Sequence, residues 1–309
     1  MLPTMTGRGL GWIAIILCLA VGTITPAAAQ DAIGVGRLTG TLKKIKDTKT
    51  VTIGYRDASV PFSYLNPART PVGYSIDLCL VIVEDIRGEL GDDTIQVKYV
   101  SVNPQNRIGM VAGGAVDLEC GTTTNNTERQ KVVSFSPIIF VSGTKLLAKR
   151  SAKFKSYRDL KNRTVVVTEA STNEAAIKAI NTKENLSITV LPVRDNTQAF
   201  DAMDTGKVDA WAGDDVILTA AATEAKRPQD YVVLGDYLSY DPYGIMYRKN
   251  DPALDALVKR TFEKLAETRE LARIYEQWFQ RKRPSGKTLG ISMSPQLRAI
   301  FEALGQPTE

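Results

Sequence analysis

The polar stretch from Asp117 to Lys131 holds the residue types with the clearest chemistry in the chain. It reads D-L-E-C-G-T-T-T-N-N-T-E-R-Q-K, which begins as a strand and ends as a helical turn. The start of a helix presents free N–H groups and the positive end of the helix dipole, and both attract anions. Arg129 adds a planar guanidinium that can hold two oxygens at once. The stretch predicts a carboxylate site, and the alternative is a capped turn with a surface arginine.

Two further arginines occupy positions where a ligand could be reached. Arg56 follows the strand expected at Val51–Tyr55, and Arg107 lies in the first turn of the helix expected after Pro104. A buried cation without a partner costs roughly several kcal/mol, so arginines that point into one cleft imply an anionic ligand or ordered counter-charges. Taken singly, each arginine is as readily a solvated or structural residue. Together with Arg129 they favour a ligand role.

The elements that must position these residues alternate between strands and helices. The first group has strands at Val51–Tyr55, Ile95–Val100 and Val116–Glu119 and helices at Ile76–Glu89 and Asn106–Ala112. The second has strands at Thr164–Thr168, Ile188–Leu191, Val208–Ala212 and Tyr231–Leu234 and helices at Asn173–Asn181, Thr197–Thr205 and Val216–Ala225. A strand at Gly244–Lys249 and two helices within Ala253–Gln280 follow. Such alternation indicates βαβ units and a mainly parallel sheet, whose ligands lie beyond the carboxyl ends of the strands.

Residues 1–29 have the pattern of a cleaved secretory signal. They carry one charge, Arg8, followed by an apolar run from about Leu10 to Val21 and a small-residue site at Ala27–Ala29. The apolar run is shorter than the roughly 20 residues that cross a bilayer, so we expect a soluble, exported protein. Lipidation at Cys18 is the minor alternative.

The rest of the chain, residues 30–309, is longer than a single compact core usually is, so two lobes are expected. The second lobe has its own polar turn, T-E-A-S-T at Thr168–Thr172, which leaves a strand and begins a helix. This turn is a second anion receptor, and we expect it to face the first across a cleft.

The composition excludes several classes of function. The chain has 39 Lys and Arg against 34 Asp and Glu, and the basic residues are scattered, which gives nucleic-acid binding little support. It has no histidine, which excludes Ser-His-Asp and Cys-His catalysis. Two cysteines alone cannot fill a tetrahedral zinc shell. We therefore expect no metal and no cofactor.

Cys79 and Cys120 are the cysteines outside the signal. In an oxidising compartment we expect a disulfide between them. It would connect the helix after Gly73 to the strand that leads into the carboxylate site. The alternative is two buried free thiols.

Four motifs carry a resemblance to a known family. They are V-P-F-S-Y at Val60–Tyr64, G-Y-S-I-D-L at Gly73–Leu78, Q-N-R-I at Gln105–Ile108 and E-C-G-x-T-T-N-N-x-E-R-Q at Glu119–Gln130. With them the chain resembles the periplasmic glutamate/aspartate-binding proteins of ABC importers, which are family 3 extracellular solute-binding proteins. The resemblance implies an α/β, type II periplasmic-binding-protein fold, with two lobes of mixed, mainly parallel sheets. A two-strand hinge is expected near Phe140–Leu147 and Leu238–Met246.

The resemblance also implies lobe boundaries and a ligand site. Lobe 1 is expected at residues 30–142 and 242–285, lobe 2 at 143–241, and a tail with a short helix at 286–309. The matched ligand residues are Arg56 and Arg107 for the side-chain carboxylate, Arg129, Thr168 and Ser171 for the α-carboxylate, and Asp214 for the α-ammonium. Thr122 and Thr124 add hydroxyls where backbone groups can reach the α-amino and α-carboxyl groups, and their alternative role is capping. The alternative for Asp214 is a helix N-cap, with Asp215 as the acid of the helix start.

Two positions depart from the family pattern. Asn196 stands where a close relative has a histidine near the side-chain carboxylate, and Pro104 stands where it has a serine. Asn196 can donate to a carboxylate but can also serve an amide, which keeps glutamine and asparagine as alternative ligands. An amide would leave charge on Arg56 and Arg107 unpaired, so glutamate or aspartate is expected.

The expected function is capture of an acidic amino acid in the periplasm and its delivery to a membrane permease with its ATPase subunit. We expect a monomer whose two lobes close over the ligand, and no enzymatic activity. One alternative is an enzyme on the same scaffold, such as a periplasmic dehydratase, because carboxylates and lysines can still do acid/base chemistry. Another is a ligand-sensing module that acts on a receptor kinase or channel.

Overall fold

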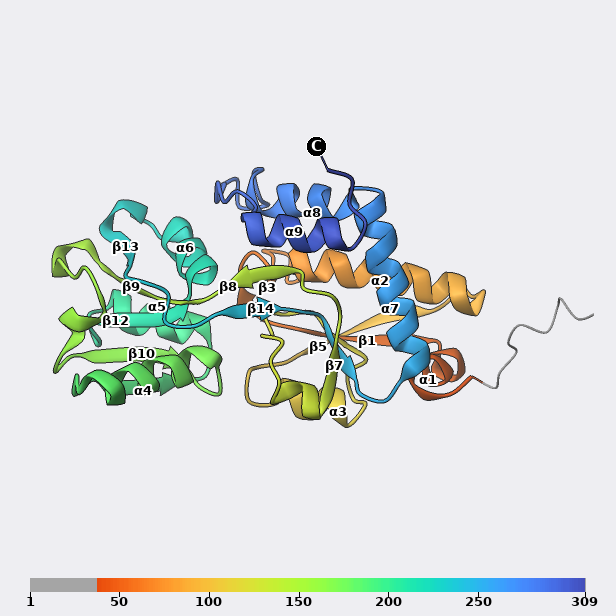
Figure 1. Ribbon diagram of the computed structural model, residues 1–309, viewed down its shortest axis with the longest axis horizontal. Coiled ribbons are helices and arrows are strands. Elements are labelled where there is room, and N and C mark those ends of the chain that lie inside the picture. The colour runs from red at the N-terminus through yellow and green to blue at the C-terminus, as the bar shows by residue number, and fades with distance from the viewer. Residues whose placement is uncertain (1–37, 309) are drawn as a thin grey trace, which may run out of the picture. The chain divides into compact units, whose positions relative to one another are not determined.

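The computed structural model describes residues 38–308, and the predicted signal sequence lies outside them. The described chain contains two five-stranded sheets (Figure 1). We call lobe 1 the part built on the sheet with strand order β5-β1-β6-β15-β7, and lobe 2 the part built on the sheet with order β11-β10-β12-β9-β13. Both sheets are mixed, as predicted, but they are not mainly parallel, because each has two parallel and two antiparallel pairings.

Lobe 1 takes its elements from both halves of the chain. Its strands are β1 (Thr50–Tyr55), β5 (Gln96–Ser101), β6 (Leu118–Glu119), β7 (Val133–Phe135) and β15 (Met246–Arg248). Its helices are α1 (Gly40–Thr48), α2 (Tyr74–Leu90), α3 (Arg107–Ala112), the 3-10 turn η1 (Arg129–Lys131), α7 (Pro252–Glu267), α8 (Glu270–Phe279) and α9 (Pro295–Ala303). A small sheet of β2 (Ala58–Ser59), β3 (Ser63–Leu65) and β4 (Pro71–Val72) follows β1. Strand β15 joins the lobe 1 sheet after the chain has passed through lobe 2.

Lobe 2 is one continuous segment. Its strands are β9 (Thr144–Lys149), β10 (Thr164–Thr168), β11 (Thr189–Val193), β12 (Ala210–Asp214) and β13 (Tyr231–Leu234). Its helices are α4 (Thr172–Glu184), α5 (Asn196–Asp204) and α6 (Asp215–Glu224), with 3-10 turns η2 (Arg150–Ala152), η3 (Tyr157–Leu160) and η4 (Pro228–Asp230). Strands β8 (Phe140–Ser142) and β14 (Asp241–Tyr243) pair antiparallel where the chain enters and leaves lobe 2. This pair is the predicted two-strand hinge.

Among residues 38–308 no helix is long and apolar enough to cross a membrane.

Parallel pairing brings three loops of lobe 1 to one edge of its sheet. In β1 the four inner residues are buried, as expected for a parallel strand covered on both faces. Tyr55 pairs with Ser101 of β5, and Gly54 pairs with Glu119 of β6. The residues that follow these three strands must therefore start at the same carboxyl edge, where ligands of such sheets lie.

Aromatic side chains fill the core beneath the hinge. Phe140 of β8 packs against Phe62, Tyr243 and Phe279 with ring centroids 5.0 to 5.9 Å apart. These rings are almost fully buried. Contacts of this kind add about 0.5–1.5 kcal/mol per pair beyond the area that they bury. The two hinge strands are thus held firmly against lobe 1 through α8.

The predicted disulfide between Cys79 and Cys120 is confirmed. Cys79 lies in α2, and Cys120 follows β6 directly, with 6.3 Å between their Cα atoms. Both residues are fully buried. The bond fixes the beginning of the Gly121–Arg129 loop, which carries the predicted carboxylate site, to the longest helix of lobe 1.

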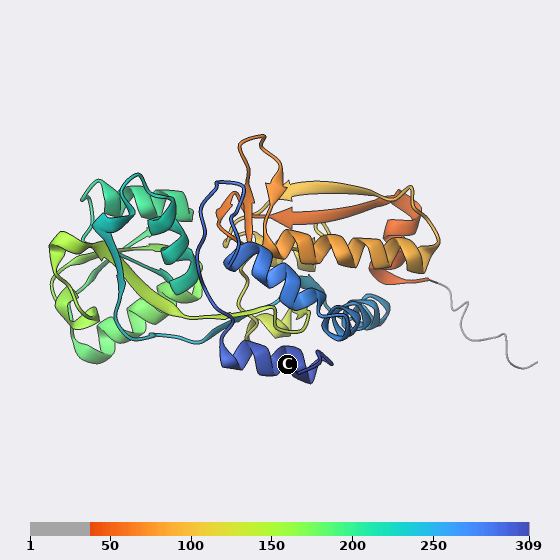
Figure 2. The same cartoon turned by 90° about the horizontal axis from the view of Figure 1, so that it is seen from above.

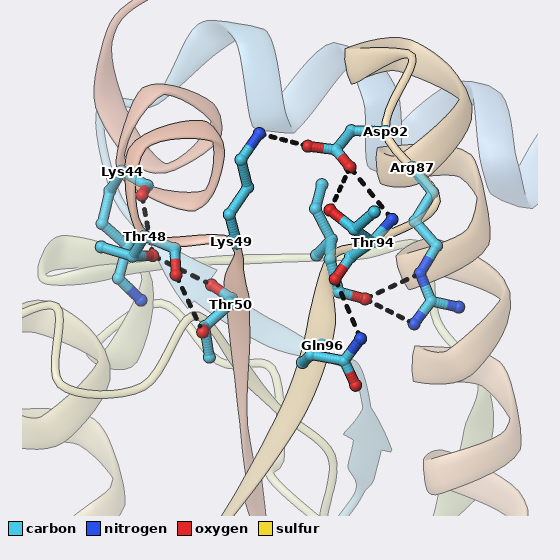
Figure 3. A network of polar contacts seen from close by, with 9 residues as sticks. Lys44, Thr48, Lys49, Thr50, Arg87, Asp92, Thr94 and Gln96 are labelled. Atoms are coloured by element: carbon cyan, nitrogen blue, oxygen red, sulfur yellow. Dashed lines mark hydrogen bonds and ion pairs between the residues drawn. The ribbon is translucent and has the colours of Figure 1, made fainter.

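The opposite end of the lobe 1 sheet is closed by a surface network of polar contacts (Figure 3). Lys49 pairs with Asp92, and the same carboxylate accepts hydrogen bonds from the N–H and hydroxyl of Thr94. Arg87 of α2 donates two hydrogen bonds to the carbonyl of Ile95, 3.0 and 2.7 Å long. The hydrogen bonds from Lys49 and Thr94 lower the pKa of Asp92 to about 2. This network holds the amino ends of β1 and β5 together, far along the strands from their carboxyl edge.

Candidate functional site

A polar cavity lies between the carboxyl edges of the two sheets. It is lined by residues of both lobes, namely Arg56, Pro104, Arg107, Thr122, Thr124, Thr168, Ser171, Thr172, Asn173, Asn196, Gly213, Asp214 and Ile217. All the ligand residues expected from the sequence line it except Arg129.

Lobe 1 supplies two buried cations to the cavity. Arg56 follows β1 and is 5% exposed, and Arg107 is the first residue of α3 and is 3% exposed. Burial, and then the neighbouring Arg107 charge, lowers the pKa of Arg56 to about 10. Burial also lowers the pKa of Arg107. Both side chains stay charged at neutral pH, so lobe 1 presents two positive charges close to each other.

Arg107 lacks partners for much of its guanidinium. Its Nε and Nη1 atoms are buried and have no hydrogen-bond partner among residues 38–308. An unpaired buried donor costs about 1–3 kcal/mol, and more when it is charged. Such a residue on a cavity wall points to an anion as the group that the cavity accepts.

Glu119 is a counter-charge to these arginines that we did not expect from the sequence. It is fully buried at the end of β6, and its charge raises the pKa of both Arg56 and Arg107. Its Oε2 accepts a hydrogen bond of 2.6 Å from the hydroxyl of Thr123. A Cβ at Gly121 would lie 2.3 Å from Oε1, so the glycine leaves room for the carboxylate. One carboxylate beside two arginines leaves a net positive wall.

Arg129 lies beside the cavity and not on its wall. Its Nη1 donates a hydrogen bond of 2.8 Å to the carbonyl of Thr124 and so supports the loop. Burial, followed by the charge of Arg107, lowers the pKa of Arg129 to about 10. The expected helical turn is present as η1, but it is a single 3-10 turn of three residues and does not begin a longer helix. The loop therefore offers hydroxyls and backbone groups without the dipole of a full helix.

Lobe 2 supplies a true helix start to the same cavity. Thr168 ends β10, and Ser171 is the N-cap of α4. The hydroxyl of Ser171 accepts a hydrogen bond of 3.1 Å from the N–H of Glu174. The Ser171 hydroxyl also donates to the carbonyl of Thr168. Ser171 therefore caps the start of α4. Thr172 and Asn173, in the first turn of α4, line the cavity and were missed from the sequence.

Asp214 is the acid of the lobe 2 wall. It ends β12 at the N-cap position of α6, yet its carboxylate makes no capping hydrogen bond. Its Oδ1 accepts a hydrogen bond of 2.9 Å from the side chain of Asn173. Burial and the nearby Asp241 carboxylate raise the pKa of Asp214 to about 6. Asp215 instead accepts from Ser142 and Tyr237 and does not line this cavity.

Asn196 uses its amide between the lobes. Its Oδ1 accepts a hydrogen bond of 2.9 Å from Thr168, and its Nδ2 donates one of 3.2 Å to the carbonyl of Ala58 in lobe 1. It also lines a neighbouring apolar cavity that includes Phe200 and Trp211. Asn196 therefore separates the polar cavity from the apolar one and connects the two lobes.

Other contacts join the lobes around the cavity. The hydroxyls of Thr124 and Thr172 are 3.3 Å apart. Thr124 also donates a hydrogen bond of 3.1 Å to Asp241 of the hinge strand β14. A chain of hydrogen bonds then runs from Asp241 through Ser239 and Thr144 to Asn173. The cavity wall is thus connected to the hinge by side chains of both lobes.

The cavity's position, charge and two-lobed construction are those of a solute-binding cleft, and comparison with known proteins gives the family. Residues 51–281 match the family described as bacterial extracellular solute-binding proteins, family 3. The chain belongs to this family. Its fold is accordingly the type II periplasmic-binding-protein fold that the motifs predicted.

Relatives of this solute-binding protein carry more specific names. It is 40% identical to an L-glutamate/L-aspartate-binding protein of Pseudomonas aeruginosa, over 93% of this chain and 94% of the relative. It is 33% identical to a glutamate/aspartate import solute-binding protein of Escherichia coli, over 93% of this chain and 94% of the relative. It is 30% identical to a glutamine-binding protein of Bacillus subtilis, over 78% of this chain and 85% of the relative.

Solved structures give the same fold. An ancestral arginine-binding protein bound to arginine superposes with a TM-score of 0.67 at 26% identity, covering 75% of this chain and 98% of its own. An ancestral amino-acid-binding protein described as a precursor of cyclohexadienyl dehydratase gives 0.67 at 27% identity, covering 78% and 100%. The curated relatives are named as binding proteins for transport and not as enzymes.

Proposed function

We propose that this solute-binding protein captures an acidic amino acid, L-glutamate or L-aspartate, between its lobes and delivers it to an ABC-type permease. The observation that carries the proposal is the charge pattern of the cavity, with Arg56 and Arg107 on the lobe 1 wall and Asp214 on the lobe 2 wall. A dicarboxylic amino acid has the complementary pattern of two carboxylates and one ammonium. The names of the relatives from Pseudomonas aeruginosa and Escherichia coli support this ligand class.

In this proposal the two buried arginines bind the side-chain carboxylate of the ligand. Arg107 contributes the Nε and Nη1 donors that have no partner among residues 38–308, and Glu119 keeps the local charge from exceeding what one carboxylate can neutralise. An amide side chain would leave those donors facing a neutral group, which sites built for a charged partner reject strongly. Charge matching therefore favours the acids over glutamine and asparagine.

The amino-acid end of the ligand is proposed to lie against lobe 2. Asp214 binds the α-ammonium, and Thr122, Thr124, Thr168 and Ser171 surround the α-carboxylate with hydroxyl and backbone groups, with Arg129 supporting the loop of lobe 1 from behind. The α-carboxylate then lies at the start of α4, where N–H groups and the helix dipole favour an anion. Asn196 contributes by holding lobe 2 against Ala58, and in this role it does not need to contact the ligand.

Closure of the lobes is the proposed signal to the permease. Ligand contacts come from both lobes, so the arrangement with the lobes together binds the ligand more tightly than the arrangement with the lobes apart. To shift a two-state equilibrium from 1:99 to 99:1 takes about 5.5 kcal/mol of differential affinity. The ionic contacts of the ligand, with the two arginines on the lobe 1 wall and with Asp214 on the lobe 2 wall, supply free energies of that order.

The cellular setting is proposed from the family and the sequence. The family is extracellular, and we propose a periplasmic location reached through cleavage of residues 1–29. We further propose a monomer that serves a permease with an ATPase subunit. The lobe boundaries at residues 30–142 with 242–285, at 143–241, and the tail at 286–309 are also proposals, supported by the positions of β8 and β14.

Calorimetric titration of the refolded, ligand-stripped protein tests the function. We expect micromolar or tighter binding of glutamate and aspartate and binding at least tenfold weaker for glutamine and asparagine. Refolding removes any ligand that is carried through purification. Equal or tighter binding of an amide would overturn the assignment of the arginines to a side-chain carboxylate, and no binding of any of the four would overturn the ligand class.

A further inference from the structure

The chain continues after the family match and contacts both lobes. The match ends at residue 281, and the segment at residues 281–294, which we call the strap, connects α8 to α9. Figure 2 shows it as a dark blue segment that passes between the two lobes. The solved relatives superpose over nearly their whole lengths on about three quarters of this chain. The remaining quarter of this chain is therefore not required for the fold that they share.

Both ends of the strap are fixed to lobe 1. At its start, α8 packs through Phe279 against the hinge strand residue Phe140. Further along, the N–H of Ile291 donates a hydrogen bond of 3.1 Å to the carbonyl of Phe279. At its end, α9 buries Leu297 and Phe301 in the main core. The strap therefore moves with lobe 1.

Polar and charged side chains in the middle of the strap contact the end of α6 in lobe 2. Arg283 forms an ion pair with Glu224, with 2.8 Å between Nη2 and Oε1 and a side chain that is 1% exposed, although the geometry at Nη2 is not that of a hydrogen bond. Ser285 donates a hydrogen bond of 2.9 Å to the same carboxylate. The Nζ of Lys287 donates to the carbonyl of Thr223 at 2.8 Å. These contacts exist only while the end of α6 lies against lobe 1.

The sequence of α6 explains why it needs these partners. Its last turn has no basic residue and ends in Glu224, which places a negative charge at the negative end of the helix dipole. Arg283 and Lys287 provide the cations that the helix lacks, and Lys287 also satisfies terminal carbonyls that have no partner within a helix.

The other end of α6 carries the acid of the cavity. Asp214 stands at its N-cap position, and Glu224 is its last residue, about 15 Å away for a helix of this length. A helix of three turns moves as a rigid body, so fixing Glu224 against lobe 1 also fixes the position of Asp214 above the two arginines.

We propose that the strap holds lobe 2 over the ligand, and that Arg283 and Lys287 are positioning residues that act on Asp214 through α6. The proposal rests on the proposed function for the presence of an amino-acid ligand, but not for which amino acid binds. Loss of the strap contacts favours separation of the lobes and speeds release of the ligand.

The test compares Arg283→Met and Glu224→Gln with the matched control Arg281→Met. Arg281 lies two residues away in the sequence, is exposed, and pairs with Glu276 of α8 and not with lobe 2. Stopped-flow fluorescence, with Trp211 and Trp278 as intrinsic probes, measures glutamate release from each full-length protein. We expect release to be about tenfold faster in Arg283→Met and in Glu224→Gln, unchanged in Arg281→Met, and largely restored in Arg283→Lys, which keeps the charge.

Small-angle X-ray scattering of the ligand-free proteins gives a second measurement that does not depend on the ligand. We expect a larger radius of gyration for Arg283→Met than for the wild type and for Arg281→Met. Equal release rates and equal radii in Arg283→Met and Arg281→Met would overturn the proposal, as would lower thermal stability alone without a change in either. Should the wild type bind no amino acid, the proposed function fails while scattering still decides the role of the strap.

Discussion

The two walls of the cleft differ in charge and in construction. The lobe 1 wall has Arg56, which follows β1, and Arg107, the first residue of α3, beside the buried Glu119, and a disulfide fixes the neighbouring Gly121–Arg129 loop to α2. The lobe 2 wall has one acid, Asp214, with hydroxyl and amide groups at the start of α4. Lobe 1 is thus a preorganised positive surface, whereas lobe 2 offers short-range hydrogen bonding and a single negative charge.

This difference suggests a division of labour in recognition. Arginines remain charged at any physiological pH, so in the proposed function lobe 1 selects the side chain of the acidic ligand. In the same proposal, Asp214 and the start of α4 recognise the groups that all amino acids share. Changes in lobe 1 should therefore alter which ligand binds, and changes in lobe 2 should alter how tightly any amino acid is retained.

The largest effect is expected from Arg107→Met. Removal of one partner of a buried charge pair costs about 2–5 kcal/mol, which corresponds to a loss of glutamate affinity of at least about 30-fold. The ligand-free protein should not lose stability, because the substitution removes a buried guanidinium whose Nε and Nη1 have no partner in the described chain. Calorimetry and thermal unfolding measure the two quantities.

The matched control for this change is Arg260→Met. Arg260 is an exposed arginine of lobe 1 that pairs with Glu89 on the surface. It should leave affinity within about twofold. A loss of ligand-free stability in Arg107→Met alone would show that Arg107 is a structural residue of lobe 1.

The next effect is expected from Asp214→Asn on the opposite wall. Loss of the ammonium's counter-charge should weaken glutamate and aspartate alike by roughly 10- to 100-fold, without changing their ratio. Asp215→Asn is the control, since Asp215 contacts Ser142 and Tyr237 outside the cavity. If Asp215→Asn proved the more damaging of the two, the assignment of the ammonium site would have to move by one residue.

A pH dependence is expected from the same carboxyl group. The pKa of Asp214 is raised to about 6 from 3.8, mainly by burial, so the folded ligand-free protein binds more protons than the unfolded chain between these values. Its stability should therefore fall as pH rises from about 4 to 6, by up to about 3 kcal/mol. Thermal unfolding of wild type and Asp214→Asn across this range measures the difference.

Ligand binding should show the opposite dependence. The ligand's ammonium favours the ionised form of Asp214, so binding below about pH 6 releases a proton from this carboxyl group. Affinity therefore weakens as pH falls below about 6, by up to tenfold per pH unit. Titrations at pH 7.5, 6.5 and 5.5 in buffers of different ionisation enthalpy count the protons. A profile for Asp214→Asn as steep as that of the wild type would assign the proton to another group.

The smallest effect is expected from Asn196→Ala. It removes the hydrogen bonds to Thr168 and Ala58, and a net hydrogen bond contributes about 0.5–1.5 kcal/mol. We expect affinity for both acids to fall about three- to tenfold with no gain of glutamine binding. A selective change toward the amides would instead place Asn196 at the ligand's side chain.

Several of these features were predictable from sequence because they depend on local pattern. Strand ends and helix starts placed Arg56 and Arg107 at the carboxyl edge of the lobe 1 sheet, where β1 and β5 pair in parallel, and placed Thr168 at the corresponding edge of the lobe 2 sheet. The choice of Asp214 as the candidate acid followed the family motif. The structure shows that β12 lies two residues further along the chain than the expected strand Val208–Ala212, because Gly213 and Asp214 pair with β9, a contact that no local pattern reveals.

The features that were missed depend on contacts between distant segments. Glu119 looked like part of a strand, and its role as counter-charge follows from where two loops place their arginines. Arg129 was expected at a helix start, but the side chain of Asn126 accepts from its N–H and the turn ends after three residues. The contacts of the strap with α6 join residues more than 50 positions apart, which a motif search does not detect.

The most direct test of the charged wall is a binding cycle with two ligands and two proteins. Dissociation constants of glutamate and glutamine are measured by calorimetry for wild type and for Arg107→Met. If Arg107 binds the side-chain carboxylate, the preference for glutamate over glutamine falls by at least about 30-fold in the variant, because only the acid loses an ionic partner. An unchanged ratio, with both ligands weakened equally, would contradict the account and place Arg107 at a group that the two ligands share.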